Sequence, residues 1–151
     1  MVIITVGELL DRCLAFETRR MAYYAAIRDR SADNGVRLLT YFLARQGRRL
    51  QHVLDDLAPS LLQQLRKVEL KFDVPLPGVS GLRLPDLLPE TNPGDALLNA
   101  ALTYDGEMVS FYKALRAQSF NEEVTEVLEA LIQGEEGDRV MLKKILDMHY
   151  F

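Results

Sequence analysis

The sequence predicts an all-α fold, a bundle of four helices built as two helical hairpins that one long connection joins. Three observations predict it. Apolar residues recur at helical spacing through four stretches of roughly 25 residues each. Short turn-forming segments divide each pair of stretches, and a proline-rich region separates the two pairs. The chain also matches itself at an offset of 88 residues, which aligns Glu17 with Asp105 and Leu43 with Leu131.

The composition indicates one globular domain over residues 1–151, since 48% of the residues are hydrophobic and the 26% that are charged include both signs. A formal net charge of -4 gives no electrostatic reason to expect nucleic acid or a membrane surface as a partner. The lone cysteine, Cys13, excludes an internal disulfide and favours a reducing cytoplasm. The apolar start, residues 1–6, is too short for a signal or membrane segment.

The first hairpin is expected to contain helices at about 5–30 and 34–57. Thr5 and Glu8 have the spacing of a capping box, in which both side chains satisfy free amides at a helix start. The first helix ends at a charged, turn-forming run, and the second stops before Pro59, whose ring would break the hydrogen-bond ladder.

The second hairpin is expected to contain helices at about 93–118 and 120–148. Asn92 and Pro93 supply a cap and a first-turn proline for the earlier helix. A second capping box, Ser119 with Glu122, starts the later one.

The connection at about 59–92 decides the topology. It is rich in proline and glycine, with room for one helical turn after Pro59. A helix of roughly 25 residues spans about 37 Å, so a chain that returns to start a parallel helix needs a long segment. Four-helix bundles with one such crossover are of the ferritin-like kind, unlike the simple up-down kind.

Each hairpin also carries a pattern of acidic and aromatic residues. Glu17 stands six residues before Tyr23-Tyr24, and Asp105 stands six before Phe111-Tyr112. In the later helix of each hairpin, Leu43-Ala-Arg-Gln-Gly47-Arg-Arg-Leu50 corresponds to Leu131-Ile-Gln-Gly-Glu135-Glu-Gly-Asp138. With these motifs, the chain resembles a rubrerythrin-type member of the ferritin-like superfamily along nearly all four helices.

The resemblance implies a site for two iron or manganese ions, held by carboxylates and two imidazoles from four helices. The family writes a glutamate and a histidine where this chain has Gly47 and Leu50, and a histidine where it has Asp138. A bridging ligand and both nitrogen donors are therefore missing. A degenerate site is expected, without the family's usual cofactor.

The remaining acids leave further readings open beside the dinuclear one. One is a mononuclear site with oxygen ligands for one iron or manganese ion. The other is a metal-free core, in which Arg20 and Arg139 lie one turn from acids on the same helical faces and neutralise them. The candidate metal ligands are Glu17, Asp105, Glu135 and Asp138.

Several other residues have an ordinary interpretation that is preferred over a functional one. His52 is expected on the surface, and His149 in a terminal turn where a cation suits the helix dipole. Cys13 is expected to pack inertly in the core. Five tyrosines at helical spacing are expected to be core residues: Tyr23, Tyr24, Tyr41, Tyr104 and Tyr112. Three arginines are expected on a solvated helix face: Arg45, Arg48 and Arg49.

Two classes of function follow. The broken ligand set favours a bundle that acts through assembly, either as a homodimer, which the resemblance implies, or with a protein partner, and the apolar tail 148–151 would add to such a contact. The alternative is a metal-binding oxidoreductase with peroxide, oxygen or iron chemistry. One cysteine cannot build the rubredoxin module of rubrerythrins, so any reductant would come from a partner protein.

Overall fold

The computed structural model describes residues 3–74, 91–118 and 120–148, and these are folded as helices and connections. No strand occurs within these three ranges, where Thr5 and Glu69 form only an isolated β-bridge. The predicted all-α class is confirmed. The described helices are α1 (Val6–Arg30), α2 (Asn34–Gln46), α3 (Arg49–Asp56), α4 (Pro59–Lys67), α5 (Pro93–Arg116) and α6 (Glu122–Asp147).

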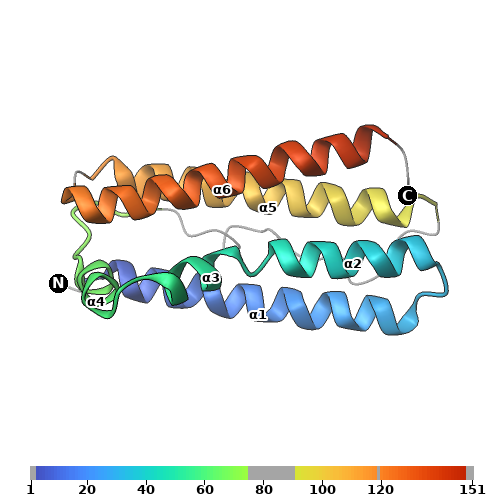
Figure 1. Ribbon diagram of the computed structural model, residues 1–151, viewed down its shortest axis with the longest axis horizontal. Helices are drawn as coiled ribbons and strands as arrows, with labels where there is room; N and C mark the ends of the chain where they lie inside the picture. The colour runs from blue at the N-terminus through green and yellow to red at the C-terminus, as the bar shows by residue number, and fades with distance from the viewer. Residues whose placement is uncertain (1–2, 75–90, 119, 149–151) are drawn as a thin grey trace.

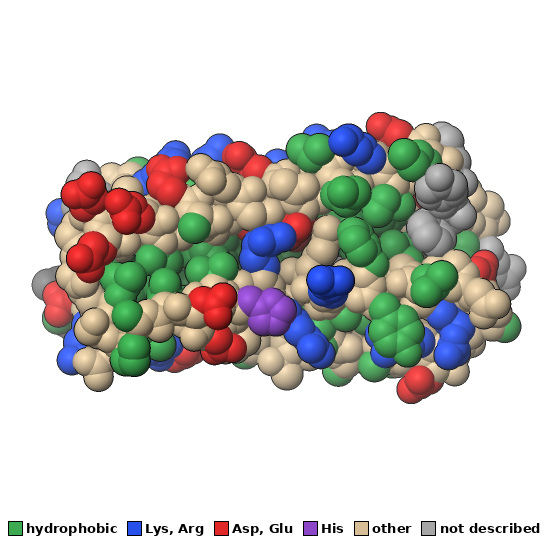
Figure 2. Space-filling view, in the orientation of Figure 1, with side chains coloured by type: hydrophobic (Ala, Val, Ile, Leu, Met, Phe, Trp, Pro, Cys, Tyr) green, Lys and Arg blue, Asp and Glu red, His purple; other side chains and the backbone are tan. Residues whose placement is uncertain are grey.

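The long helices lie side by side in two layers (Figure 1). In one layer α1 runs against α2, and α3 continues the direction of α2; in the other, α5 packs along α6. Contacts of α2 with α5 and of α3 with α6 join the layers, and α4 lies across one end against α1 and α6. On the face toward the viewer, acidic side chains gather over the first turns of α6 and basic ones near the middle (Figure 2). None of the described helices is long and apolar enough to cross a bilayer.

The apolar core is divided into two clusters along the bundle. On α1, the first cluster reaches Phe16 and the second begins with Tyr24. On α6 the first cluster ends at Ile132 and the second contains Leu142. Along α2 and α3 the order is reversed, since Leu43 belongs to the second cluster and Leu50 to the first. The buried charged residues lie on the helices between these limits. We call this level of the bundle the polar layer, and it contains the candidate site.

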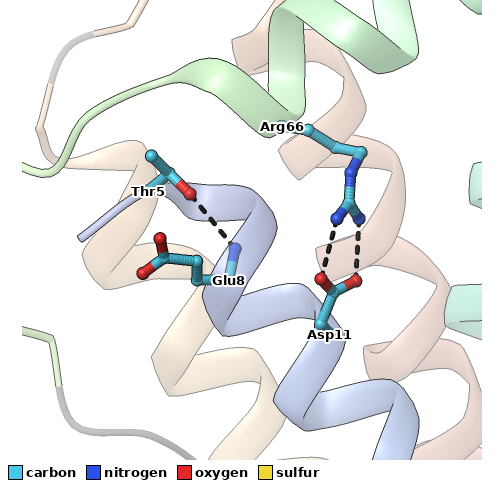
Figure 3. Close-up of polar contacts among 4 residues, drawn as sticks. All are labelled: Thr5, Glu8, Asp11 and Arg66. Atoms are coloured by element: carbon cyan, nitrogen blue, oxygen red, sulfur yellow. Dashed lines mark hydrogen bonds and ion pairs between the residues drawn. The ribbon is translucent and has the colours of Figure 1, made fainter.

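A side-chain cap and an ion pair stabilise the first turns of α1 (Figure 3). The Thr5 hydroxyl accepts a hydrogen bond from the Glu8 amide at 3.2 Å, so the Thr5 half of the predicted capping box is confirmed. Asp11 accepts two hydrogen bonds from Arg66 of α4, at 2.8 and 2.7 Å. A Cβ on Gly7 would lie 2.7 Å from the Arg66 carbonyl oxygen, so only glycine permits this approach of α4 to α1.

In the second hairpin, the later helix begins at a different cap from the predicted one. Asn121 caps α6 by accepting a hydrogen bond from the Val124 amide at 2.9 Å, so the helix starts at Glu122, shortly after the predicted start at about 120. Asparagine at this position provides the same acceptor that serine was expected to provide. Residue 119 is outside the described ranges. Pro93 opens α5 as predicted. The predicted cap from the Asn92 side chain is wrong, because Asn92 is in the left-handed conformation, with φ of 52°, and makes no capping hydrogen bond.

The predicted continuous helix at 34–57 is wrong, because it is divided into α2 and α3 at Gly47 and Arg48. The Gly47 amide still donates to the Leu43 carbonyl, at 2.9 Å, while the Arg48 amide turns to Arg45, only three residues back, at 3.4 Å. Glycine is a weak helix former, and the ladder tightens at this point before it resumes.

The connection begins with more helix than expected. Instead of one turn it contains the nine-residue α4, which starts with a proline at its first position. The segment after α4 is held by Gln118, which follows α5. The Gln118 side chain accepts a hydrogen bond from the Lys71 amide at 2.8 Å and donates one to the Phe72 carbonyl at 2.9 Å. The rest of the predicted crossover, residues 75–90, lies outside the described residues.

Candidate functional site: a buried layer of carboxylates and arginines

The four acids predicted from the sequence are all buried, with exposed fractions of 4 to 7%. Glu17 comes from α1, Asp105 from α5, and Glu135 and Asp138 from α6. Their charges influence one another, since each of Glu17, Asp105 and Asp138 contributes to the raised pKa of Glu135. The fold therefore brings the predicted acids into one layer.

The carboxyl groups of Asp105 and Glu135 interact directly. Burial raises both pKa values, to about 6 for Asp105 and about 9 for Glu135. Their interaction lowers the pKa of Asp105 and raises that of Glu135, so the pair retains one proton near neutral pH. Two acids this close in a low dielectric are not both ionised near neutral pH.

Glu17 also holds its proton more tightly than an exposed glutamate. Burial raises its pKa to about 8; Arg20 acts in the opposite direction, and the charge of Asp105 adds to the rise. Desolvation of the carboxylate therefore outweighs the nearby guanidinium.

Arg20 is 3% exposed and lies in the same layer. Its Nη2 donates to the Tyr24 hydroxyl at 2.8 Å, and its guanidinium carbon is 4.3 Å from the centre of the Tyr104 ring. Its charge lowers the pKa of both Glu17 and Asp105. The predicted neutralising cation is thus present, although its hydrogen bond goes to a tyrosine.

Arg139 was expected to act on Glu135 of its own helix. Its guanidinium instead lies about 3.6 Å from the place that a Cβ on Gly106 of α5 would occupy, and its charge lowers the pKa of Asp105. The absence of a side chain at Gly106 makes room for this approach between helices.

Arg49 is the residue that the sequence reasoning missed. Its Nε and Nη2 donate to the two carboxylate oxygens of Asp138, at 2.8 and 2.6 Å, in a bidentate ion pair from α3 to α6. The expectation that Arg49 belongs only to a solvated helix face is wrong, although 36% of its side chain remains exposed.

A glycine of α6 makes this ion pair possible. A Cβ on Gly134 would lie 2.6 Å from Arg49 Cδ, so α6 must be bare where the arginine crosses it. The sequence signals for this ion pair were Gly134, beside Glu135, and Arg49, beside Leu50. Neither residue predicts the contact unless the packing of α3 against α6 is known.

The positions of the missing family ligands are filled by other atoms. A Cβ on Gly47 would lie 2.7 Å from Met21 Cε and 3.6 Å from Arg20 Nη1, so these side chains occupy the space of a ligand there. Leu50 is fully buried in the first apolar cluster. In the part of the chain that the structure describes, no three His, Cys, Asp or Glu residues are grouped so as to hold a metal ion. Both oxygens of Asp138 face Arg49, which is consistent with that result.

The other singled-out residues mostly follow their ordinary interpretation. Burial raises the pKa of Cys13 to about 12, as expected of an inert core thiol. His52 is exposed, and position 149 is outside the described residues. Three of the five tyrosines are core residues, Tyr23 is partly buried, and Tyr41 is 57% exposed, so for Tyr41 the core prediction is wrong. The buried three are Tyr24, Tyr104 and Tyr112.

Comparison with protein-family models, with curated proteins and with solved structures gives no match for this chain. The likeness to rubrerythrin-type proteins consequently depends on the residues quoted from the sequence.

Proposed function

We propose that this chain is a ferritin-like four-helix bundle that acts through assembly or partner binding and that lacks the conventional dinuclear metal centre of rubrerythrin-type proteins. The observation that carries the proposal is the bidentate contact between Arg49 and Asp138. A guanidinium supplies positive charge to a buried carboxylate in a fixed planar geometry, as a metal ion otherwise would.

The charges of the polar layer support a metal-free interior. Three guanidinium groups, from Arg20, Arg49 and Arg139, act on its carboxylates. Burial also leads Glu17 and Glu135 to retain protons, since their pKa values rise to about 8 and about 9. Arginines and retained protons together offset the negative charge that a family member balances with metal.

Exposed apolar side chains on two neighbouring helices support assembly, with a second copy of the chain as the first candidate. Leu38 and Tyr41 on α2 are 69% and 57% exposed, and Val140 and Met141 on α6 are 55% and 47% exposed. Hydrophobic side chains gather over the C-terminal half of α6 and over α2 on the face toward the viewer (Figure 2). Several exposed apolar side chains on one face are typical of an interaction surface.

The assembly proposal is tested by the mass of the protein in solution across a wide concentration range, measured by sedimentation equilibrium. We expect a dimer that Leu38→Glu combined with Met141→Glu dissociates, with unchanged helical circular dichroism. Glu123→Gln, at an exposed site on α6 outside the apolar patch, is the control. A monomer at every concentration would exclude self-assembly, and co-purification from the native host would then be needed to identify a partner.

A second candidate is the metal-binding oxidoreductase with a reduced carboxylate site. Glu17, Asp105 and Glu135 would supply its ligands, because they are buried in the same layer and are not paired with arginine in a bidentate contact. Their side chains would have to move closer together, since as they stand in the described chain they form no group that could hold a metal ion. These oxygens would suit one iron or manganese ion. The test is metal content after expression in supplemented medium, with thermal unfolding in added Mn²⁺ or in chelator. If metal binds, the melting temperature rises with free metal, and Glu135→Ala removes that rise. Equal melting curves and no retained metal exclude this candidate.

A further inference from the structure

A groove of about 600 Å³ lies between the α2–α3 junction and the later turns of α6. On the α6 side its wall includes Gly137, where an added Cβ would meet no other atom within 4 Å. The groove is therefore open above this glycine. Its volume is in the range of small-molecule sites in proteins.

Basic groups line the α2–α3 side of this groove. Arg45 of α2 and His52 of α3 line it, and neither has a hydrogen-bond or ion-pair partner among the described residues. Arg49 uses Nε and Nη2 on Asp138, which leaves Nη1 as a further donor. Figure 2 shows Lys and Arg side chains gathered around a histidine near the middle of this face.

The acids in the wall do not cancel this character. Asp138 is already neutralised by its ion pair with Arg49. Asp56 is the last residue of α3, far along the wall from Arg45. The end of the groove near Arg45 and Arg49 is thus the favourable place for a negative group.

Apolar side chains complete the same walls. Phe42 and Val53 line the groove from α2 and α3, and Met141 lines it from α6. Gln46 adds a buried carbonyl oxygen, Oε1, that has no hydrogen-bond partner in the described chain. A ligand with a negative head, an apolar body and one hydrogen-bond donor would satisfy all three features.

We propose that this groove is a binding site for a small organic anion, a carboxylate or phosphate carried on an apolar body. The head pairs with Arg45 and with the free Nη1 of Arg49, and the body lies on Phe42 and Met141. The site needs neither a second copy nor a metal, and it shares Met141 with the face proposed for assembly.

Calorimetric titration of the full chain in low salt with chelator tests the proposal, with octanoate and phenyl phosphate as probes for the two head groups and inorganic phosphate as the head alone. We expect saturable binding of at least one amphiphilic probe that weakens in high salt. Arg45→Gln should lower its affinity about tenfold, since a charge-assisted hydrogen bond is lost. Gly137→Leu should abolish binding by filling the groove. Arg12→Gln, an exposed arginine on α1 outside the groove, should leave it unchanged.

The proposal is overturned if neither amphiphilic probe binds at about 10 mM, a level well above the dissociation constant of even a weak site. It is also overturned if inorganic phosphate binds as tightly as both amphiphilic probes, because the apolar walls then contribute nothing. Arg45 is exposed, so Arg45→Gln keeps the fold and decides the question even if Gly137→Leu does not fold. Equal affinities of Arg45→Gln and the unsubstituted chain contradict the assigned head position.

Discussion

Replacing Arg49 by glutamine measures what the ion pair across the polar layer contributes to stability. The substitution removes both hydrogen bonds to Asp138, whose side chain is only 9% exposed, and leaves that carboxylate without its cation. Breaking a fully buried ion pair costs about 3–5 kcal/mol. The Arg49 side chain is 36% exposed, so solvent screening reduces the expected loss to about 1–3 kcal/mol.

A loss of this size lowers the melting temperature of a domain of 151 residues by about 3–10 °C. Urea and thermal unfolding at pH 7 in chelator give both quantities. The matched control is Arg48→Gln, one residue away on an exposed side chain without a described ion pair, where we expect a change below about 0.5 kcal/mol.

A double-mutant cycle completes the test. In Asp138→Asn combined with Arg49→Gln, no uncompensated carboxylate remains, so the double variant should be more stable than the sum of the two single losses predicts. If Arg49→Gln costs no more than Arg48→Gln, the contact does not hold α3 to α6, and the argument for a guanidinium in place of a metal loses its basis.

Three other predictions concern pH and glycine. The pKa of Glu135 is about 9 in the folded chain and 4.5 ordinarily, so between these two pH values the folded state binds a proton that the unfolded state has released. This contribution to stability is fully present below pH 4.5 and is lost as the pH rises toward 9. In chelator, the melting temperature of the unsubstituted chain should therefore fall from pH 6 to 9, and that of Glu135→Gln should fall less. Equal decreases in the two chains would contradict a raised pKa at Glu135. Gly137→Ala should raise the free energy of unfolding, measured in urea, by up to about 1 kcal/mol, because alanine favours helix and no atom obstructs its Cβ. Gly47→Ala should lose stability despite the same gain in propensity, because its Cβ would lie 2.7 Å from Met21 Cε; a gain like that of Gly137→Ala would refute the close contact.

Helical periodicity and cap chemistry predicted much of the fold. Thr5 and Pro93 were placed correctly because caps and first-turn prolines depend on local backbone geometry. The division at Gly47 was missed, since a single glycine is tolerated in many helices.

The candidate site was predictable in its acids but not in its cations. Burial of Glu17 and Glu135 follows from repeat position and helical face, which the sequence contains. The partner of Asp138 lies 89 residues away on another helix, and its approach depends on Gly134 having no side chain. Pairing of this kind is a property of helix packing, so spacing within one helix pointed to Arg20 and Arg139 instead.

The polar layer also limits how the two hairpins can be aligned. If α6 moved by one turn along α5, about 5.4 Å, Glu135 would leave Asp105 and face apolar neighbours, while Asp138 would separate from Arg49. Leucine-rich surfaces alone tolerate such a shift, because one apolar side chain replaces another. Charged groups that are satisfied only in one alignment make the shifted arrangements costly. The buried acids thus fix the alignment of α6 along α5, whether or not any metal binds.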